Sequence, residues 1–212
     1  MTPRILCALL LSWVASGTIV DRTAIVVGKH VVKDSDIQRD IAITNFLNGS
    51  EPDFSVESRK KSATRLIDQE LIRQQILSGR YPVAQELEAT QLLEQTKKDR
   101  YANDTEYRSA LRRLGISESE LKDALLWQLT VLRFIEARFR PVVNVSGAEV
   151  QKYYDGHKPA LSKAYPNAKG MDDMRPRIED LIAGEQVNKL LDEWLVQSRK
   201  ETRIQYLEKS LE

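Results

Sequence analysis

The sequence predicts a mainly α-helical protein with a small β-sheet formed by its N-terminal and C-terminal strands. Apolar residues recur at helical spacing through most of the chain, which indicates amphipathic helices. Two Ser-x-x-Glu capping boxes, beginning at Ser117 and Ser146, mark the starts of two of these helices. Short strand-like runs lie near the two ends of the chain, at 23–27 and 203–207. The length of 212 residues is enough for one moderate domain or two small lobes.

The first 17 residues have the features of a cleavable signal peptide. Arg4 precedes a largely apolar run over 5–14, and the small residues 15–17 follow it. The run of about ten residues is too short to span a bilayer, which needs roughly 20. We therefore expect cleavage near Gly17 and a periplasmic or secreted protein without stable membrane insertion. The alternatives for this segment are a buried N-terminal helix and a membrane anchor.

Composition and charge exclude several classes of function for the mature chain. Cleavage would remove Arg4 and the only cysteine, Cys7, which takes the 32 basic residues down to 31, against 31 acidic ones. A near-neutral chain lacks the basic surplus that phosphate binding requires, so we expect no nucleic acid partner. A chain without cysteine forms no disulfide and has no thiol nucleophile.

The pattern of apolar, capping and breaking residues predicts the order of elements along the mature chain. Helices begin at capping residues such as Ser55 and end near Gly or Pro. The helix over 83–98 is poorly amphipathic, so we expect it to project into solvent or to form one wall of a loosely packed arm. By residue number, the predicted elements are a strand pair at 23–27 and 30–32, helices over 36–47, 56–77, 83–98, 104–114 and 118–140, a short helix that holds Tyr153 and Tyr154, a linker over 156–173, a final helix from about 173 and a strand over 203–207.

The segment 118–140 is predicted to be the central helix of the core. Its apolar residues fall on two sides, and a helix that is apolar on two sides is packed from two sides. The first stripe consists of Leu121, Leu125, Leu129, Leu132, Ile135 and Phe139, and the second of Trp127, Val131 and Phe134.

The strand over 203–207 needs a partner, because an isolated strand leaves backbone hydrogen-bonding groups unpaired. The nearest candidate is the run 25–27. We therefore predict that the two ends of the mature chain meet in a small sheet.

The order of these parts resembles the SurA/PrsA/PpiC group of exported chaperones and prolyl isomerases. The opening of that group runs VAxVNgxxIxxSDvd, and residues 24–37 of this chain are AIVVGKHVVKDSDI. Residues 126–154, which end in PVVNVSGAEVQKYY, resemble the group's long helix and the VtdeEvxxYY segment after it. Residues 175–207 resemble its C-terminal helix and closing strand. The resemblance implies a SurA N-terminal-like helical chaperone region over 18–155, which 174–212 completes.

The resemblance also implies that one part of the group is missing here. A parvulin-type isomerase domain usually precedes the C-terminal helix and needs roughly 100 residues, whereas only the linker over 156–173 stands in that place. The group's isomerase site uses paired histidines, and this chain has two in all, His30 in the first strand pair and His157 in the linker. No acid or cysteine cluster lies near His30 in the sequence, which favours a structural role for it. We therefore expect no catalytic residue, no metal and no cofactor.

The candidate client-binding residues are Trp127, Phe134 and Phe139 on the central helix. The alternative is that these aromatic side chains pack in the core. The resemblance implies an ATP-independent holdase that shields unfolded or nascent exported polypeptides, among them secreted and outer-membrane proteins, and that has no small-molecule substrate. Two further hypotheses remain, a residual prolyl isomerase and a dedicated adaptor of an export machine.

Overall fold

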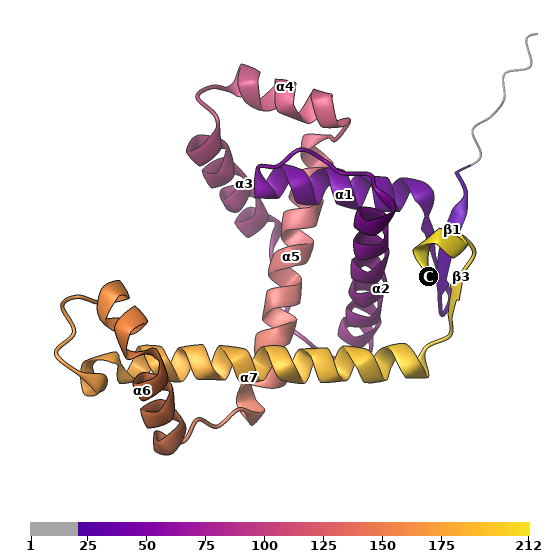
Figure 1. The fold of residues 1–212 in the computed structure, drawn as a ribbon. Helices are drawn as coiled ribbons and strands as arrows, with labels where there is room; N and C mark the ends of the chain where they lie inside the picture. Colours follow the sequence, from indigo (N-terminus) through magenta and orange to yellow (C-terminus); the bar gives the residue numbers. More distant parts are fainter. Residues whose placement is uncertain (1–20) are drawn as a thin grey trace, which may run out of the picture.

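The computed structural model describes residues 21–212 and shows a mainly helical protein (Figure 1). Within this range there are seven α-helices and one three-stranded antiparallel sheet, which confirms the predicted fold class. The predicted signal peptide, residues 1–17, lies outside the described residues. The elements are β1 (Thr23–Val27), β2 (His30–Lys33), α1 (Asp34–Asn48), α2 (Val56–Ser78), α3 (Glu86–Arg100), α4 (Asp104–Leu114), α5 (Glu118–Phe139), the 3-10 turn η1 (Arg140–Val142), α6 (Gly147–Ala164), α7 (Met171–Glu201), β3 (Ile204–Tyr206) and the 3-10 turn η2 (Lys209–Leu211).

The sheet joins the two ends of the described chain. β1 lies in the centre and pairs antiparallel with β2 on one side and with β3 on the other. Ile25 lies opposite Tyr206 and Val27 opposite Ile204, which confirms that the N-terminal and C-terminal strands meet. Gly28 begins the turn between β1 and β2 with a φ of 60°, a backbone conformation that only glycine adopts readily.

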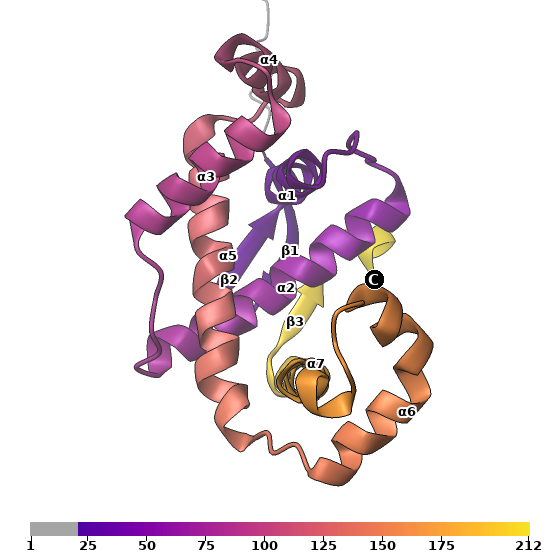
Figure 2. The same cartoon turned by 90° about the vertical axis from the view of Figure 1, so that its left-hand side faces the viewer.

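Four helices form a frame that positions the rest of the molecule. In Figure 1, α2 and α5 both run from the level of α1 to the level of α7, and Figure 2 shows α1 and α7 nearly end-on. α1 packs against α2, while α2 and α5 both pack against α7. The sheet packs with α1 and α2 around one hydrophobic cluster, in which Ile25, Val27 and Ile37 have no exposed surface.

α3 and α4 cover the end of α5 that lies away from α7 (Figure 1). α3 packs along α5, where its Ala89 and Leu93 are buried with Leu121 and Leu125. Of the two expectations for this helix, projection into solvent is therefore wrong. Two apolar residues four positions apart lie on one face of the helix, and here they hold α3 against α5.

The predicted linker over 156–173 is mostly helical, which corrects that prediction. α6 continues to Ala164 and α7 begins at Met171, so that only residues 165–170 lie between the two helices. α6 packs against the first half of α7 at one end of the molecule (Figure 1). Among residues 21–212, no helix combines the length and hydropathy that crossing a bilayer requires.

Pro159 lies inside α6, although a proline normally ends a helix. Its ring removes one backbone donor from the helical ladder, at a cost of about 3 kcal/mol. The helix continues because the next turn is held by tertiary packing: Leu161 is buried with Met174 and Ile178 of α7. Burial of one leucine side chain contributes about 1.5–3 kcal/mol, which is of the size needed to offset the proline.

Replacing Ile25 by alanine is expected to lower the free energy of unfolding by about 2–5 kcal/mol, because the side chain is fully buried and its truncation leaves a cavity. Urea denaturation followed by circular dichroism measures this change. Leu207→Ala is the matched control, since Leu207 follows β3 directly and is 59% exposed. It should change the free energy of unfolding by about 0.5 kcal/mol or less. Equal losses in the two variants would contradict the placement of β1 in the core.

Candidate functional site

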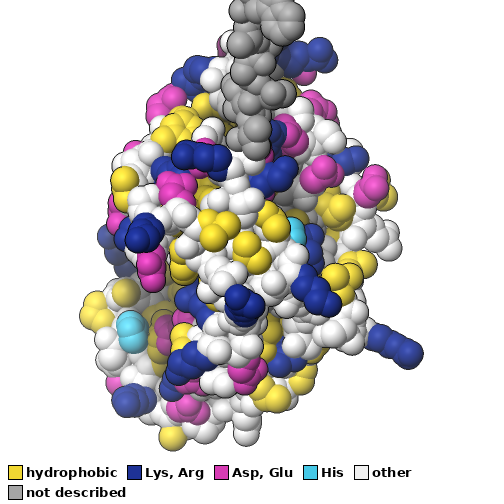
Figure 3. All heavy atoms as spheres, turned by 90° about the vertical axis from the view of Figure 1, so that its right-hand side faces the viewer, with side chains coloured by type: hydrophobic (Ala, Val, Ile, Leu, Met, Phe, Trp, Pro, Cys, Tyr) yellow, Lys and Arg dark blue, Asp and Glu magenta, His cyan; other side chains and the backbone are white. Residues whose placement is uncertain are grey.

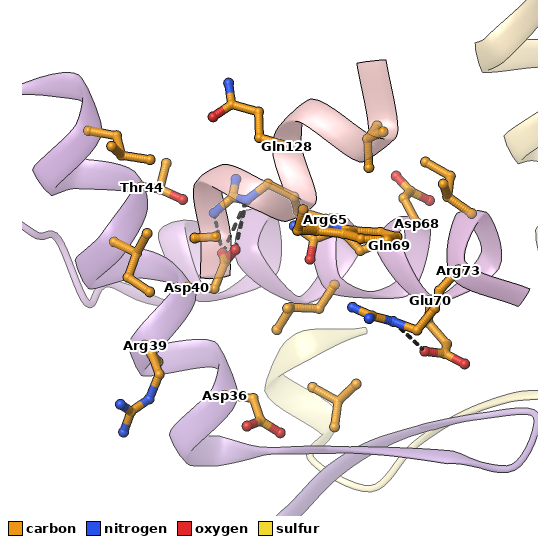
Figure 4. Close-up of a pocket in the computed structure, with 18 of the residues that line it drawn as sticks. Asp36, Arg39, Asp40, Thr44, Arg65, Asp68, Gln69, Glu70, Arg73 and Gln128 are labelled. Atoms are coloured by element: carbon orange, nitrogen blue, oxygen red, sulfur yellow. Dashed lines mark hydrogen bonds and ion pairs between the residues drawn. The ribbon is translucent and has the colours of Figure 1, made fainter. Parts of the chain in front are cut away.

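An open groove of about 700 Å³ lies between α1, α2 and α5, and β2 contributes to its wall. In Figure 4, labelled side chains from α1, α2 and α5 lie around this space. Its apolar lining comes from all four elements, and consists of Val31, Val32, Ile43, Leu47, Leu66, Ile72, Ala124, Trp127, Val131 and Leu132.

Helical spacing brings the lining residues of each helix onto one face. On α5, Ala124, Gln128 and Val131 follow one another at intervals of four and three residues, so they point to the same side. On α1, Ile43 and Leu47 are one turn apart and form a second apolar stripe beside the buried one. That second stripe is the sequence signal from which this groove wall could have been found.

The groove exposes apolar surface on α5. Leu132 lines it and is 53% exposed. Val31 of β2 lies at its rim and is 42% exposed, with its side chain on the outer face of the sheet. The two-sided pattern of the central helix placed Leu132 in the core, and the structure corrects that expectation. Accessible apolar side chains that gather in one concavity are characteristic of binding sites, whereas single exposed ones are not.

Ion pairs within the chain satisfy the charged residues along α1. Arg65 donates to the Asp40 carboxylate at 2.5 Å (Figure 4), and Ser62 donates to the same carboxylate at 2.6 Å. Arg39 forms an ion pair with Glu120. Such charge-assisted hydrogen bonds leave little need for an external partner.

Asp68 and Glu70 on α2 also have partners within the chain. Arg199 of α7 donates two hydrogen bonds to Asp68, at 2.7 and 2.5 Å. Burial raises the pKa of the Asp68 carboxyl, and the guanidinium offsets only part of that effect. Glu70 Oε2 lies 3.6 Å from Arg73 Nε (Figure 4) and 3.6 Å from His30 Nδ1. Basic and acidic side chains are likewise interspersed on the face shown in Figure 3.

Trp127 is the predicted client-binding residue that lines the groove. The guanidinium carbon of Arg73 lies 4.3 Å from the centroid of its ring, in a cation–π contact. The indole Nε1 is buried and has no hydrogen-bond partner among the described residues. A buried donor without a partner carries a free-energy cost.

Phe134 and Phe139 lie in the core and do not line the groove. Phe134 has no exposed surface and Phe139 is 6% exposed. The ring of Phe134 packs against Tyr81 and Trp194, with centroid distances of 4.9 and 5.7 Å. For these two residues the structure supports core packing, which corrects the expectation that they contact a client.

The two histidines lie on separate parts of the molecule. His30 is on β2 and His157 is on α6, and the sheet and α6 lie at opposite ends of α7 (Figure 1). His157 belongs to a helix and not to a linker, and its ring stacks on Tyr153 with centroids 4.1 Å apart. Within residues 21–212, no group of three or more histidine, cysteine or acidic side chains is placed to hold a metal ion.

Comparison with known proteins assigns the chain to no family. No model of a known protein family matches it, and no curated protein is significantly similar to it. The resemblance to the SurA/PrsA/PpiC group therefore rests on the sequence motifs and their order.

Phe134→Ala is expected to lower the free energy of unfolding by about 3–5 kcal/mol, because a fully buried aromatic ring is lost from the core. Leu132→Ala, two residues away on the same helix, should lower it by about 0.5 kcal/mol or less. Urea denaturation of the two variants measures the difference. Comparable losses would mean that Leu132 belongs to the core and that the groove is not open at this point.

Proposed function

We propose that this chain is an ATP-independent chaperone that binds unfolded exported polypeptides in the groove between α1, α2 and α5. The observation that carries the proposal is accessible apolar surface, above all at Leu132, in a concavity whose charged side chains are already paired. The predicted signal peptide supports an exported location. The resemblance to the SurA/PrsA/PpiC group supports the chaperone role.

Binding in this groove would rest on apolar burial, which is worth roughly 25 cal/mol per Å² and is not directional. A charged client segment would lose its hydration without gaining a partner, because carboxylates such as Asp40 and Asp68 already receive hydrogen bonds from arginines. The groove therefore favours uncharged apolar segments, which folded proteins bury and unfolded proteins expose.

Release of the client needs no nucleotide in this proposal. The sequence contains no nucleotide-binding motif. Binding many different segments also limits affinity, because a general groove cannot be complementary in shape to each of them. Folding of the client, or its transfer to another protein, would then be sufficient to empty the groove.

The protein is expected to suppress aggregation of a chemically denatured model client at roughly equimolar concentration. Leu132→Glu should raise the concentration needed for half-suppression by about fivefold or more, because an unpaired carboxylate then lies in the apolar wall. Light scattering after dilution of the client from denaturant measures both. Val196→Glu is the matched control, since Val196 is a helical valine on α7 that is 49% exposed and does not line the groove.

Two outcomes would contradict the proposal. One is the absence of suppression at a several-fold excess of the protein. The other is equal loss of suppression in Leu132→Glu and Val196→Glu, because general surface charge and not the groove would then control the effect. Isolation of a single stoichiometric partner, without binding to unfolded clients, would favour the adaptor hypothesis instead.

The protein is expected not to accelerate cis–trans isomerisation of a proline-containing peptide. The reason is the separation of His30 on β2 from His157 on α6, which leaves no histidine pair to act together. A protease-coupled peptide assay measures the rate. An acceleration that His157→Ala abolishes would establish an isomerase and contradict this expectation.

A further inference from the structure

β2 is an edge strand that lies against the groove. The order of strands is β2-β1-β3, so within residues 21–212 one side of β2 has no neighbouring strand. His30, Val31 and Val32 all line the groove. An unpaired strand edge is a template for another extended segment, because its backbone donors and acceptors are already in line.

The register of the sheet shows which backbone groups of β2 are free. The backbone N–H of Gly28 donates to the C=O of Arg203, and the N–H of Leu207 donates to the C=O of Ala24. The backbone N–H and C=O groups of the even-numbered residues of β1 therefore point toward β3. The direction of the backbone N–H and C=O groups alternates along a strand, so these groups of Ile25 and Val27 point toward β2. Their partners on β2 are Val32 and His30, respectively.

Val31, between these two residues, directs its N–H and C=O away from β1. Val31 lies at the rim of the groove, and its side chain is on the outer face of the sheet, because His30 and Val32 on either side of it face α2 and the core. The next backbone donor is already used, because the N–H of Lys33 donates to the Asp36 carboxylate at 2.8 Å. Within the described part of the chain, the free edge is therefore one residue wide and is centred on Val31.

Charge selects among the possible occupants of this edge. Lys29 and Lys33 lie two positions on either side of Val31. If two copies of the chain paired antiparallel through Val31, Lys29 of each would lie opposite Lys33 of the other, and like charges directly opposite are destabilising. An uncharged segment meets no such repulsion. The groove beyond the edge also favours an uncharged occupant, since its Asp40 and Asp68 are paired within the chain.

We propose that β2 receives an extended client segment as an additional strand, which bonds to the N–H and C=O of Val31. The two residues that flank the one opposite Val31 then have their side chains on the face of His30 and Val32, toward the groove, so these two residues are apolar. The segment carries no Lys or Arg two positions to either side of the residue opposite Val31. This inference rests on the proposed chaperone function and specifies how the groove recognises its client without reading one sequence.

Amide hydrogen exchange with short peptides tests the strand addition directly. The probe is an uncharged peptide that alternates valine and serine, so that its valines face the groove when it pairs with β2. At saturating peptide, the Val31 amide should exchange about tenfold more slowly. A peptide methylated on its serine nitrogens should give no protection, since the serine lies opposite Val31 and its N–H is the one that bonds to β2. The control is the same peptide methylated on its valine nitrogens, which point away from β2 and should leave the protection intact.

Two variants of Val31 give a second measurement. Val31→Ala and Val31→Pro both shorten the side chain, but only proline removes the N–H. A proline is tolerated on a strand edge where the N–H faces solvent, and circular dichroism checks that both variants fold. Val31→Pro should bind the valine–serine peptide about fivefold more weakly than Val31→Ala.

The exchange experiment needs no variant and therefore decides the proposal if Val31→Pro does not fold. Strand addition is overturned if Val31 gains no protection, or if the two methylated peptides protect it equally. Should that happen while the protein still suppresses aggregation, the chaperone function stands and only this mode of binding is lost. Protection of Val31 in a protein that suppresses no aggregation would support the strand addition and remove the chaperone function.

Discussion

Phe134 lies where α2, α5 and α7 meet, and the position of the groove depends on its burial. Its ring packs against Tyr81, Phe139 and Trp194, which come from the segment after α2, from α5 and from α7. This aromatic cluster fixes one end of α5 against α7. The opposite end is held by α3 and α4 through Leu121 and Leu125. Because α5 is fixed at both ends, its middle turn can leave Leu132 accessible without loss of the fold.

The same arrangement explains how a groove with so many charged residues can still present an apolar surface. Asp68 is tied to Arg199 of α7, and Asp40 is tied to Arg65, so the frame itself neutralises these carboxylates. Partly buried charge of this kind contributes little net stability, since desolvation opposes the attraction. Its consequence lies in selectivity, because most of the remaining accessible surface of the groove is apolar.

Much of the fold follows from sequence, whereas the site follows only in part. The pairing of β1 with β3 could be predicted because the run 203–207 needed a partner, and capping residues located the start of α5. The second half of α6 could not be predicted, because a proline ends most helices. At Pro159 only the burial of Leu161 against α7 overrides that effect. The division of α5 into a core face and a groove face could not be predicted from the sequence either. Both sides of that helix are apolar, and which side stays open depends on where α7 crosses it.

The central claim is that the groove between α1, α2 and α5 contacts unfolded polypeptides, and site-specific photo-crosslinking tests it most directly. A photoreactive amino acid is placed at position 132 in the groove or at position 196 on α7, and each protein is mixed with a denatured client. We expect abundant crosslinks from position 132 and background levels from position 196. Equal crosslinking from the two positions, or crosslinking from 196 alone, would contradict it.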